Sequence, residues 1–119
     1  MSHLYDAEVK AAMASAAKAA GITLNTGGIY AGFNGPRFET HAEIRLARLA
    51  GATVVGMTGV PEVSLAKEAG LRYAAIALVV NLAAGVSDKP ITMDDINAAL
   101  KAASEKVITI LDGTIKAFA

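Results

Sequence analysis

The sequence predicts an α/β fold in which a partial, mainly parallel sheet is flanked by helices. Short apolar runs rich in β-branched residues alternate with longer stretches of helical spacing. Apolar residues make up 54% of the 119 residues, which is enough for a buried core. Strands that alternate with helices are typical of parallel strands joined by helical crossovers. We therefore expect a single α/β domain over residues 1–119.

Two helices and one strand are predicted in the first half of the chain. Residues 5–20 place apolar side chains at helical spacing, and Gly21 ends that run. Residues 28–33 are expected to form a short strand. Thr40 and Glu43 fit a capping box, in which each side chain satisfies a backbone N–H that the first helical turn leaves free. A helix should therefore begin at Thr40 and stop at Gly51.

The second half of the chain continues the alternation. Residues 53–57 predict a strand, and Pro61 suits the first position of a helix that runs to Gly70. Residues 73–80 are apolar throughout, as in a strand covered on both faces. Thr92 resembles the start of a second capping box, and it opens a long helix. The inward face of that helix is expected to be Ile96, Leu100, Ala103, Val107, Ile110 and Phe118. Three strands are few for so apolar a chain, so we expect part of a larger sheet.

Composition excludes several classes of function. Eleven acidic and eleven basic residues balance, which gives no electrostatic signal for nucleic acid or an anionic membrane. The chain has no cysteine, so thiolate catalysis and thiolate metal sites are excluded. Its two histidines, His3 and His41, are far apart in sequence, and we expect no metal site. Neither a secretion signal nor a membrane-spanning run is present, which favours a cytoplasmic protein.

Polar and aromatic side chains follow each predicted strand. Because ligands of open α/β sheets bind where parallel strands end, we expect Phe38, Glu39, Thr58 and Asn81 to converge on one crevice. They offer an aromatic ring, a carboxylate, a hydroxyl and a carboxamide. This set suits a flat, polar heterocycle that stacks on the ring and exchanges hydrogen bonds with the other groups.

Each of these residues also has a structural interpretation. Glu39 could be a solvated charge favoured by the helix dipole, and Phe38 could be a hydrophobic staple. Met57 could fill the core, Thr58 could cap the next helix, and Asn81 could hold a turn together. His41 is expected to face solvent from the first turn of its helix.

Longer blocks carry a family resemblance. The stretch "GPRFETHAEIR", followed by "GATVVGMTGVPEVSLAKEAGLRYAAIALVVNLAAG", resembles the C-terminal half of the trimeric purine nucleoside phosphorylase and methylthioadenosine phosphorylase family. The blocks cover most of the chain. The resemblance implies a three-layer phosphorylase fold, a homotrimer and a place in purine salvage. The family's N-terminal half would supply a glycine-rich phosphate loop and several strands of the sheet.

The resemblance also implies roles for single residues. Phe38 and Glu39 would line the purine pocket together with Val80, which stands where relatives often place Thr or Ser. Asn81 would contact the base at N7 and O6 and serve catalysis there. The resemblance further places Met57 against the ribose and Thr58 at the phosphate.

The reaction implied is phosphorolysis, in which inorganic phosphate attacks C1′ of a purine nucleoside and no cofactor is needed. Family members acting on 6-oxopurines carry Glu and Asn at the positions of Glu39 and Asn81. Met93 aligns where other members place a His toward the 5′-hydroxyl, which favours 5′-methylthioinosine over inosine or guanosine. The alternative is a truncated, catalytically incomplete relative that serves as a base-binding or assembly module.

Overall fold

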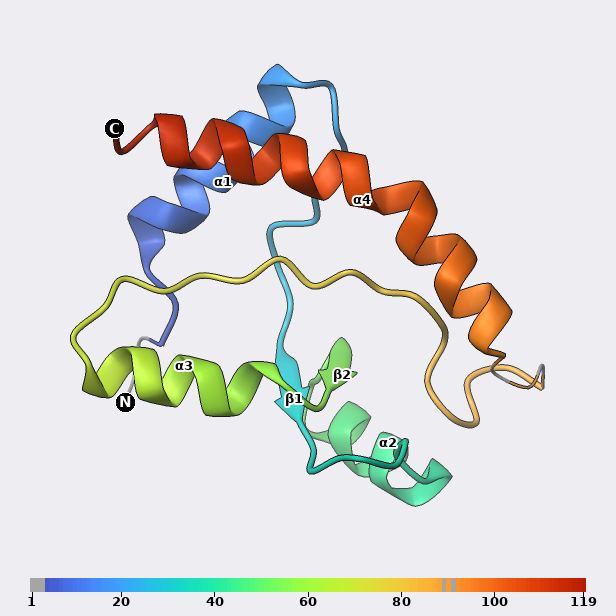
Figure 1. Cartoon of the computed structure of the whole chain (residues 1–119). Coiled ribbons are helices and arrows are strands. Elements are labelled where there is room, and N and C mark those ends of the chain that lie inside the picture. Colours follow the sequence, from blue (N-terminus) through green and yellow to red (C-terminus); the bar gives the residue numbers. More distant parts are fainter. Residues whose placement is uncertain (1–3, 89, 91) are drawn as a thin grey trace.

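The computed structural model describes residues 4–88, 90 and 92–119. Within them, helices and strands follow one another as the sequence predicts for the first five elements (Figure 1). The elements are α1 (Ala7–Ala19), β1 (Tyr30–Gly32), α2 (His41–Leu49), β2 (Val54–Gly56), α3 (Gly59–Glu68) and α4 (Met93–Lys116). None of the described helices is long and apolar enough to cross a membrane.

Side-chain caps fix where three of the helices begin. Asp6 precedes α1 and accepts a hydrogen bond from the Val9 N–H at 2.9 Å. Thr40 precedes α2, where both halves of the predicted capping box are present. Thr92 precedes α4 and accepts from the backbone N–H of Asp95. The caps at Thr40 and Thr92 are those that the sequence predicts, whereas the Asp6 cap was not predicted.

Strands β1 and β2 form a two-stranded parallel sheet. Tyr30 lies opposite Val54, and Gly32 lies opposite Gly56. The chain passes from one strand to the other through α2, so β1, α2 and β2 make a βαβ unit. The predicted α/β architecture with a small parallel sheet flanked by helices is confirmed.

The third predicted strand, over residues 73–80, is not formed. The segment is extended, but among the described residues its backbone makes no ladder with another strand. It is anchored at its start, where the Asp6 N–H donates to the Tyr73 carbonyl at 2.7 Å and the Tyr73 hydroxyl donates to Glu62 at 2.8 Å. Burial raises the pKa of Tyr73 to about 12, and the hydrogen bond to Glu62 is the next largest cause of this shift. Apolar composition predicted a strand here, yet a strand also requires a partner for its backbone.

Helix α3 begins two residues before Pro61, which corrects the predicted start. Thr58 stands at the N-cap, and Gly59 is the first helical residue. Pro61 is tolerated as the third helical residue, because the first four N–H groups of a helix have no partner within it.

The core lies where α1 packs against α4. Met13, Ala17 and Ile110 are its buried centre, and Ala74 and Ile76 of the extended segment pack against them. A side chain added at Gly113 of α4 would begin 2.8 Å from the Ala16 methyl carbon, inside van der Waals contact. The missing side chain is therefore what lets the two helices approach so closely.

Two members of the predicted inward face of α4 are exposed. Leu100 is 41% exposed and Phe118 is 49% exposed. The Arg72 guanidinium lies over the Phe118 ring, 5.0 Å from its centroid. Arg72 also pairs with Asp6 and Glu8, at 3.0 Å and 2.6 Å. The predicted inward face is therefore covered only in part.

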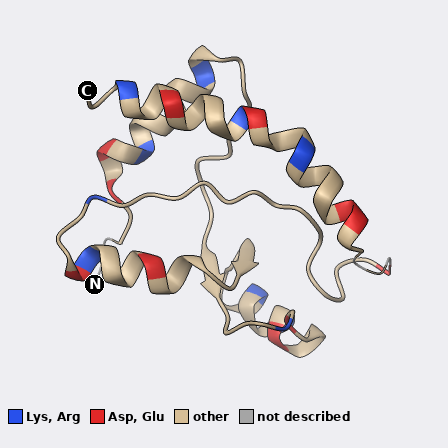
Figure 2. Cartoon of the chain, viewed as in Figure 1, with Lys and Arg blue, Asp and Glu red and all other residues tan. Residues whose placement is uncertain are grey.

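Charges of both signs are spread over the helices. In the cartoon of Figure 2, basic and acidic positions are interspersed along α1, α3 and α4.

Candidate active site

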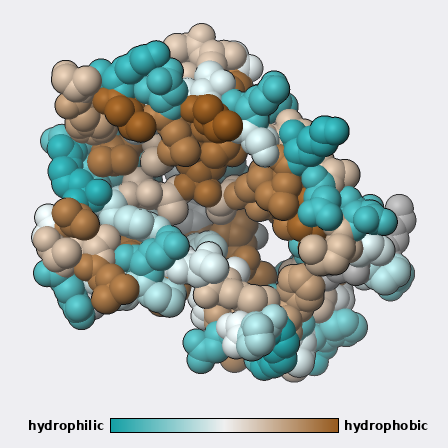
Figure 3. All heavy atoms as spheres, viewed as in Figure 1, coloured by the Kyte–Doolittle hydropathy of each residue, from teal (hydrophilic) through white to brown (hydrophobic). Residues whose placement is uncertain are grey.

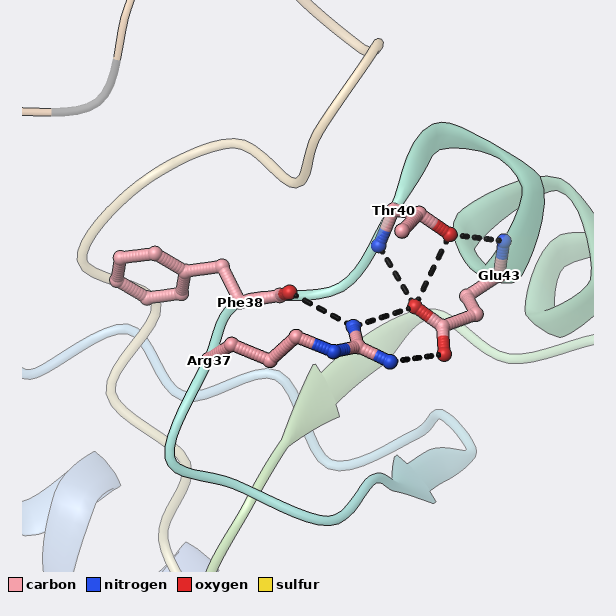
Figure 4. A network of polar contacts seen from close by, with 4 residues as sticks. All are labelled: Arg37, Phe38, Thr40 and Glu43. Carbon is pink, nitrogen blue, oxygen red and sulfur yellow. Dashed lines mark hydrogen bonds and ion pairs between the residues drawn. The ribbon is translucent and has the colours of Figure 1, made fainter.

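The loop between β1 and α2 is held in place by one carboxylate, that of Glu43. Its Oε2 accepts hydrogen bonds from the Thr40 N–H at 2.7 Å and from the Thr40 hydroxyl at 3.0 Å. The Arg37 guanidinium binds both oxygens of the same carboxylate at 2.8 Å (Figure 4). Arg37 also donates to the Phe38 carbonyl at 3.0 Å. The backbone of residues 37–40 is thus fixed directly in front of α2.

These contacts set the charge state of Glu43. The Arg37 guanidinium, followed by the Thr40 backbone and side chain, lowers the pKa of Glu43 from 4.5 to about 2. The same pair raises the pKa of Arg37 above its usual range. The sequence predicted Glu43 as part of a helix cap but gave Arg37 no role. An Arg three residues before a capping Thr is the signal that could have suggested this contact.

Phe38 and Glu39 stand on this fixed loop with different exposure. Phe38 is 52% exposed, and Figure 4 shows its ring directed away from α2. A hydrophobic staple would instead turn the ring toward that helix. Glu39 is half-buried, and its Oε1 is shielded from solvent without accepting a hydrogen bond from any described residue. Shielded carboxylate oxygens normally accept at least one hydrogen bond, so we expect this oxygen to accept one from a donor outside the described residues.

The end of β2 lies beside the same loop. The Phe33 N–H donates to the Gly56 carbonyl at 2.9 Å, so both chains leave the sheet side by side. Met57 is half-buried, and its sulfur lies 3.1 Å from where a side chain at Gly35 would begin. Thr58 is exposed at the start of α3, and its side chain makes no capping hydrogen bond. Its hydroxyl is therefore available to a ligand in front of α3.

The segment after the extended chain reaches the first turn of α2. A side chain at Gly85 would begin 3.1 Å from the His41 ring, so these two residues are in contact. The exposed His41 ring thus lies over the 81–87 segment rather than wholly in solvent. A cavity of about 220 Å³ lies between α2 and residues 84–86, with His41 and Arg45 on its wall.

Two further residues that were predicted for the site come just before the segment that contacts α2. Val80 and Asn81 are both half-buried. The Asn81 amide donates to the neighbouring Leu82 carbonyl at 2.9 Å, the kind of local bond expected of a turn residue. Its side-chain oxygen and second amide hydrogen are not used in that bond.

Met93 stands apart from this group. It is the first residue of α4 and is 64% exposed. In Figure 1 this end of α4 lies away from the ends of β1 and β2. The structure therefore brings Gly35 of the loop together with Met57, and residues 84–86 together with α2. Val80, Asn81 and Met93 belong to neither group.

The order of these elements and the residues at the strand ends can be compared with known proteins. The model of a family described as the phosphorylase superfamily matches residues 1–116. The chain belongs to the phosphorylase superfamily. This confirms the family that the sequence blocks around Glu39 and Asn81 indicated.

Individual superfamily members agree with this assignment. The chain is 48% identical over 92 residues to "Probable 6-oxopurine nucleoside phosphorylase" of Moorella thermoacetica, covering 77% of this chain and 35% of that protein. It is 47% identical over 103 residues to "Probable S-methyl-5'-thioinosine phosphorylase" of Xanthomonas campestris pv. campestris, covering 86% and 41%. The chain thus spans less than half the length of these relatives.

A solved structure shows the same fold. The methylthioadenosine phosphorylase from Schistosoma mansoni in complex with adenine superposes with a TM-score of 0.91 at 28% sequence identity. The superposition covers 99% of this chain and 47% of that one. The arrangement of the four helices and two strands is therefore that of part of a phosphorylase.

Proposed function

We propose that this phosphorylase chain carries the base-recognition part of a 6-oxopurine nucleoside phosphorylase. The observation behind the proposal is the Glu39 Oε1 atom, which is shielded from solvent and accepts no hydrogen bond from the described residues. Hypoxanthine and guanine carry an N1–H that such an oxygen can accept. Adenine N1 is itself an acceptor and would be repelled. Relatives named as 6-oxopurine and S-methyl-5'-thioinosine phosphorylases support this choice of base.

The other side chains of the loop and the strand ends have complementary roles. The exposed Phe38 ring offers a stacking surface for the purine, and Val80 gives the base an apolar neighbour. Met57 packs against the ribose. The Thr58 hydroxyl, at the N-terminus of α3, binds phosphate, since unpaired N–H groups and the helix dipole favour an anion there.

The reaction is phosphorolysis. A phosphate oxygen forms a bond to C1′ as the bond between C1′ and the purine N9 breaks, and the electron pair of that bond moves onto the purine. The Asn81 amide donates to N7 and stabilises the negative charge that develops on the leaving base. The departing purine anion takes up a proton that the phosphate or water supplies. The products are the free base and a ribose 1-phosphate, and inorganic phosphate is the only co-substrate. We propose that the active assembly is a homotrimer.

The 5′ substituent is the second point of substrate choice. Met93 is apolar and offers no hydrogen bond to a 5′-hydroxyl, whereas its thioether suits a methylthio group. We therefore place 5′-methylthioinosine ahead of inosine and guanosine. Met93 lies outside the groups that the structure joins, so this role requires the start of α4 to approach the ribose.

Hypoxanthine binding tests the proposal. Calorimetric titration of the wild-type chain with hypoxanthine is compared with Glu39→Gln and with Glu68→Gln, an exposed carboxylate at the end of α3. Loss of a charge-assisted hydrogen bond of about 1.5–3 kcal/mol predicts that Glu39→Gln binds roughly 10–150-fold more weakly. Glu68→Gln should bind as the wild type does. Equal affinity of Glu39→Gln and wild type would refute the role of Glu39.

A further inference from the structure

Two of the four arginines of this chain have no partner among the described residues. Arg37 and Arg72 are each held by carboxylates at 3.0 Å or less. The side chains of Arg45 and Arg48, by contrast, make no ion pair or hydrogen bond with any described residue. Both stand on α2, and both are exposed. Their guanidinium groups are therefore free to bind a ligand.

Arg45 and Arg48 share one side of α2 with His41. Side chains three and four positions apart on a helix are neighbours, with about 5–6 Å between their Cβ atoms. All three side chains line the cavity of about 220 Å³ between α2 and residues 84–86. None of the described residues on its wall is acidic. Figure 3 shows hydrophilic side chains over α2, at the bottom of that view.

The opposite wall of the cavity depends on Gly85. Its φ of 75° lies in the left-handed region that glycine adopts without strain. A side chain there would begin 3.1 Å from the His41 ring, so the glycine also allows residues 84–86 to approach α2. Ala84 and Val86 line the cavity on this side, and Ile44 of α2 is buried at its wall. The cavity thus joins a basic side to an apolar one.

The arginine pair determines which anion fits. A guanidinium fork matches both carboxylate and phosphate oxygens, and one fork is enough for the two oxygens of a carboxylate. A phosphate monoester has three terminal oxygens, so two neighbouring forks can bind it together. The cavity of about 220 Å³ is smaller than ordinary ligand pockets of roughly 300–1,000 Å³. It therefore suits a phosphate group that carries a short carbon chain.

We propose that this cavity binds a small phosphate monoester. Arg45 and Arg48 hold the phosphoryl group, the His41 ring offers a further hydrogen bond, and the carbon chain lies against the apolar side. Neither Glu39 nor Thr58 lines the cavity. The inference is therefore independent of the base and phosphate contacts proposed above.

The test is a titration of the whole chain with glycerol 3-phosphate, followed by calorimetry and by amide NMR. A phosphate-free buffer of low ionic strength is used, because salt screens exposed charges. We expect saturable 1:1 binding, with the largest amide shifts at residues 84–86 and 44–48. Glycerol should not bind, because it has no charge. Succinate and inorganic phosphate, followed at the same amides, should bind more weakly than glycerol 3-phosphate.

Variants of the two arginines sharpen the test. Arg45→Gln and Arg48→Gln should each bind glycerol 3-phosphate roughly tenfold or more weakly, because each loses a charge-assisted hydrogen bond. Both should melt as the wild type does, since neither side chain has a partner among the described residues. Arg48→Lys keeps the charge but loses the fork, so its affinity should be intermediate. Lys101→Gln, at an exposed position of α4, loses the same charge and should bind as the wild type does.

The proposal has several ways to fail. It is overturned by a wild-type chain that shows no saturable binding, or by amide shifts centred on residues 58–60 instead of 84–86. Succinate or inorganic phosphate binding as tightly as glycerol 3-phosphate would refute the choice of a phosphate monoester. Unchanged affinity in either Gln variant, wild-type affinity in Arg48→Lys, or a lower melting temperature of a Gln variant would refute the role of the free guanidinium pair. Hypoxanthine is absent from every arm, so failure of base recognition is a separate result.

Discussion

At the scale of single residues, the position of Glu39 depends on its neighbours Arg37 and Glu43. Glu43 binds the Arg37 guanidinium with both oxygens and also binds Thr40, which fixes the backbone on either side of Glu39. The sequence predicted the Thr40–Glu43 cap because a capping box is a local pattern. It did not predict the Arg37 contact, since that depends on how the loop after β1 turns back toward α2.

The Glu43 carboxylate gives a pH prediction. Its pKa in the folded chain is about 2, below the ordinary value of 4.5. A depressed folded pKa stabilises the fold above about pH 4.5, and this contribution is lost as the pH falls from 4.5 toward 2. Wild type should therefore be more stable than Glu43→Gln at pH 7, and the difference should shrink to near zero at about pH 2. Chemical denaturation at both pH values measures the difference, and carbon-detected NMR titration of Glu43 gives the pKa itself. A titration midpoint near 4.5 would contradict the Arg37 contact.

At the scale of elements, local signals and long-range pairing differ in how well sequence predicts them. The helix starts at Thr40 and Thr92 are predictable because each cap joins two residues that are three positions apart in the sequence. Residues 73–80 have the composition of a buried strand, but a strand forms only where another backbone pairs with it. The sequence therefore located the extended apolar segment, but it did not show that this segment pairs with no other strand. Leu100 and Phe118 were predicted to face inward, but they are exposed, because helical spacing shows which side of a helix is apolar and not how much of that side a neighbour covers.

The α1–α4 contact gives a stability prediction. Gly113 lies so close to Ala16 that Gly113→Val must push the two helices apart. Overpacking of this kind costs about 1–3 kcal/mol of unfolding free energy. Ala102→Val, at an exposed position of the same helix, should cost only a few tenths of a kcal/mol, because valine has a lower helix propensity than alanine. Urea denaturation of both variants measures the difference. Equal stability of the two variants would show that the helices do not approach this closely.

At the scale of the whole molecule, the chain has the fold of part of a phosphorylase and exposes a large surface for its mass. Among the described residues, the extended backbone of residues 74–80 pairs with no strand, and Ile108, Leu111 and Ile115 of α4 are exposed. Residue patterns indicated both the α/β class and the small size of the sheet. They could not show which surfaces stay uncovered, because exposure depends on which elements pack together in the folded chain.

The exposed area predicts the heat capacity of unfolding. A domain of 119 residues ordinarily shows about 1.4–1.8 kcal/mol/K. The unfolded chain exposes about 17,500 Å², so this fold buries roughly three quarters of the area that a compact domain would bury. Scanning calorimetry of the monomer should therefore give roughly 1.1–1.4 kcal/mol/K. A value at or above about 1.7 kcal/mol/K would contradict the large exposed area, because it would require as much buried surface as in a compact domain.

The proposed contact between Glu39 and the N1–H of a 6-oxopurine is tested most directly by a crystal structure of the chain with hypoxanthine. We expect N1 of the base about 2.7–3.0 Å from Glu39 Oε1, as in a charge-assisted hydrogen bond, with the Phe38 ring stacked on the purine. A base bound elsewhere, or one bound here with Glu39 turned into solvent, would contradict it.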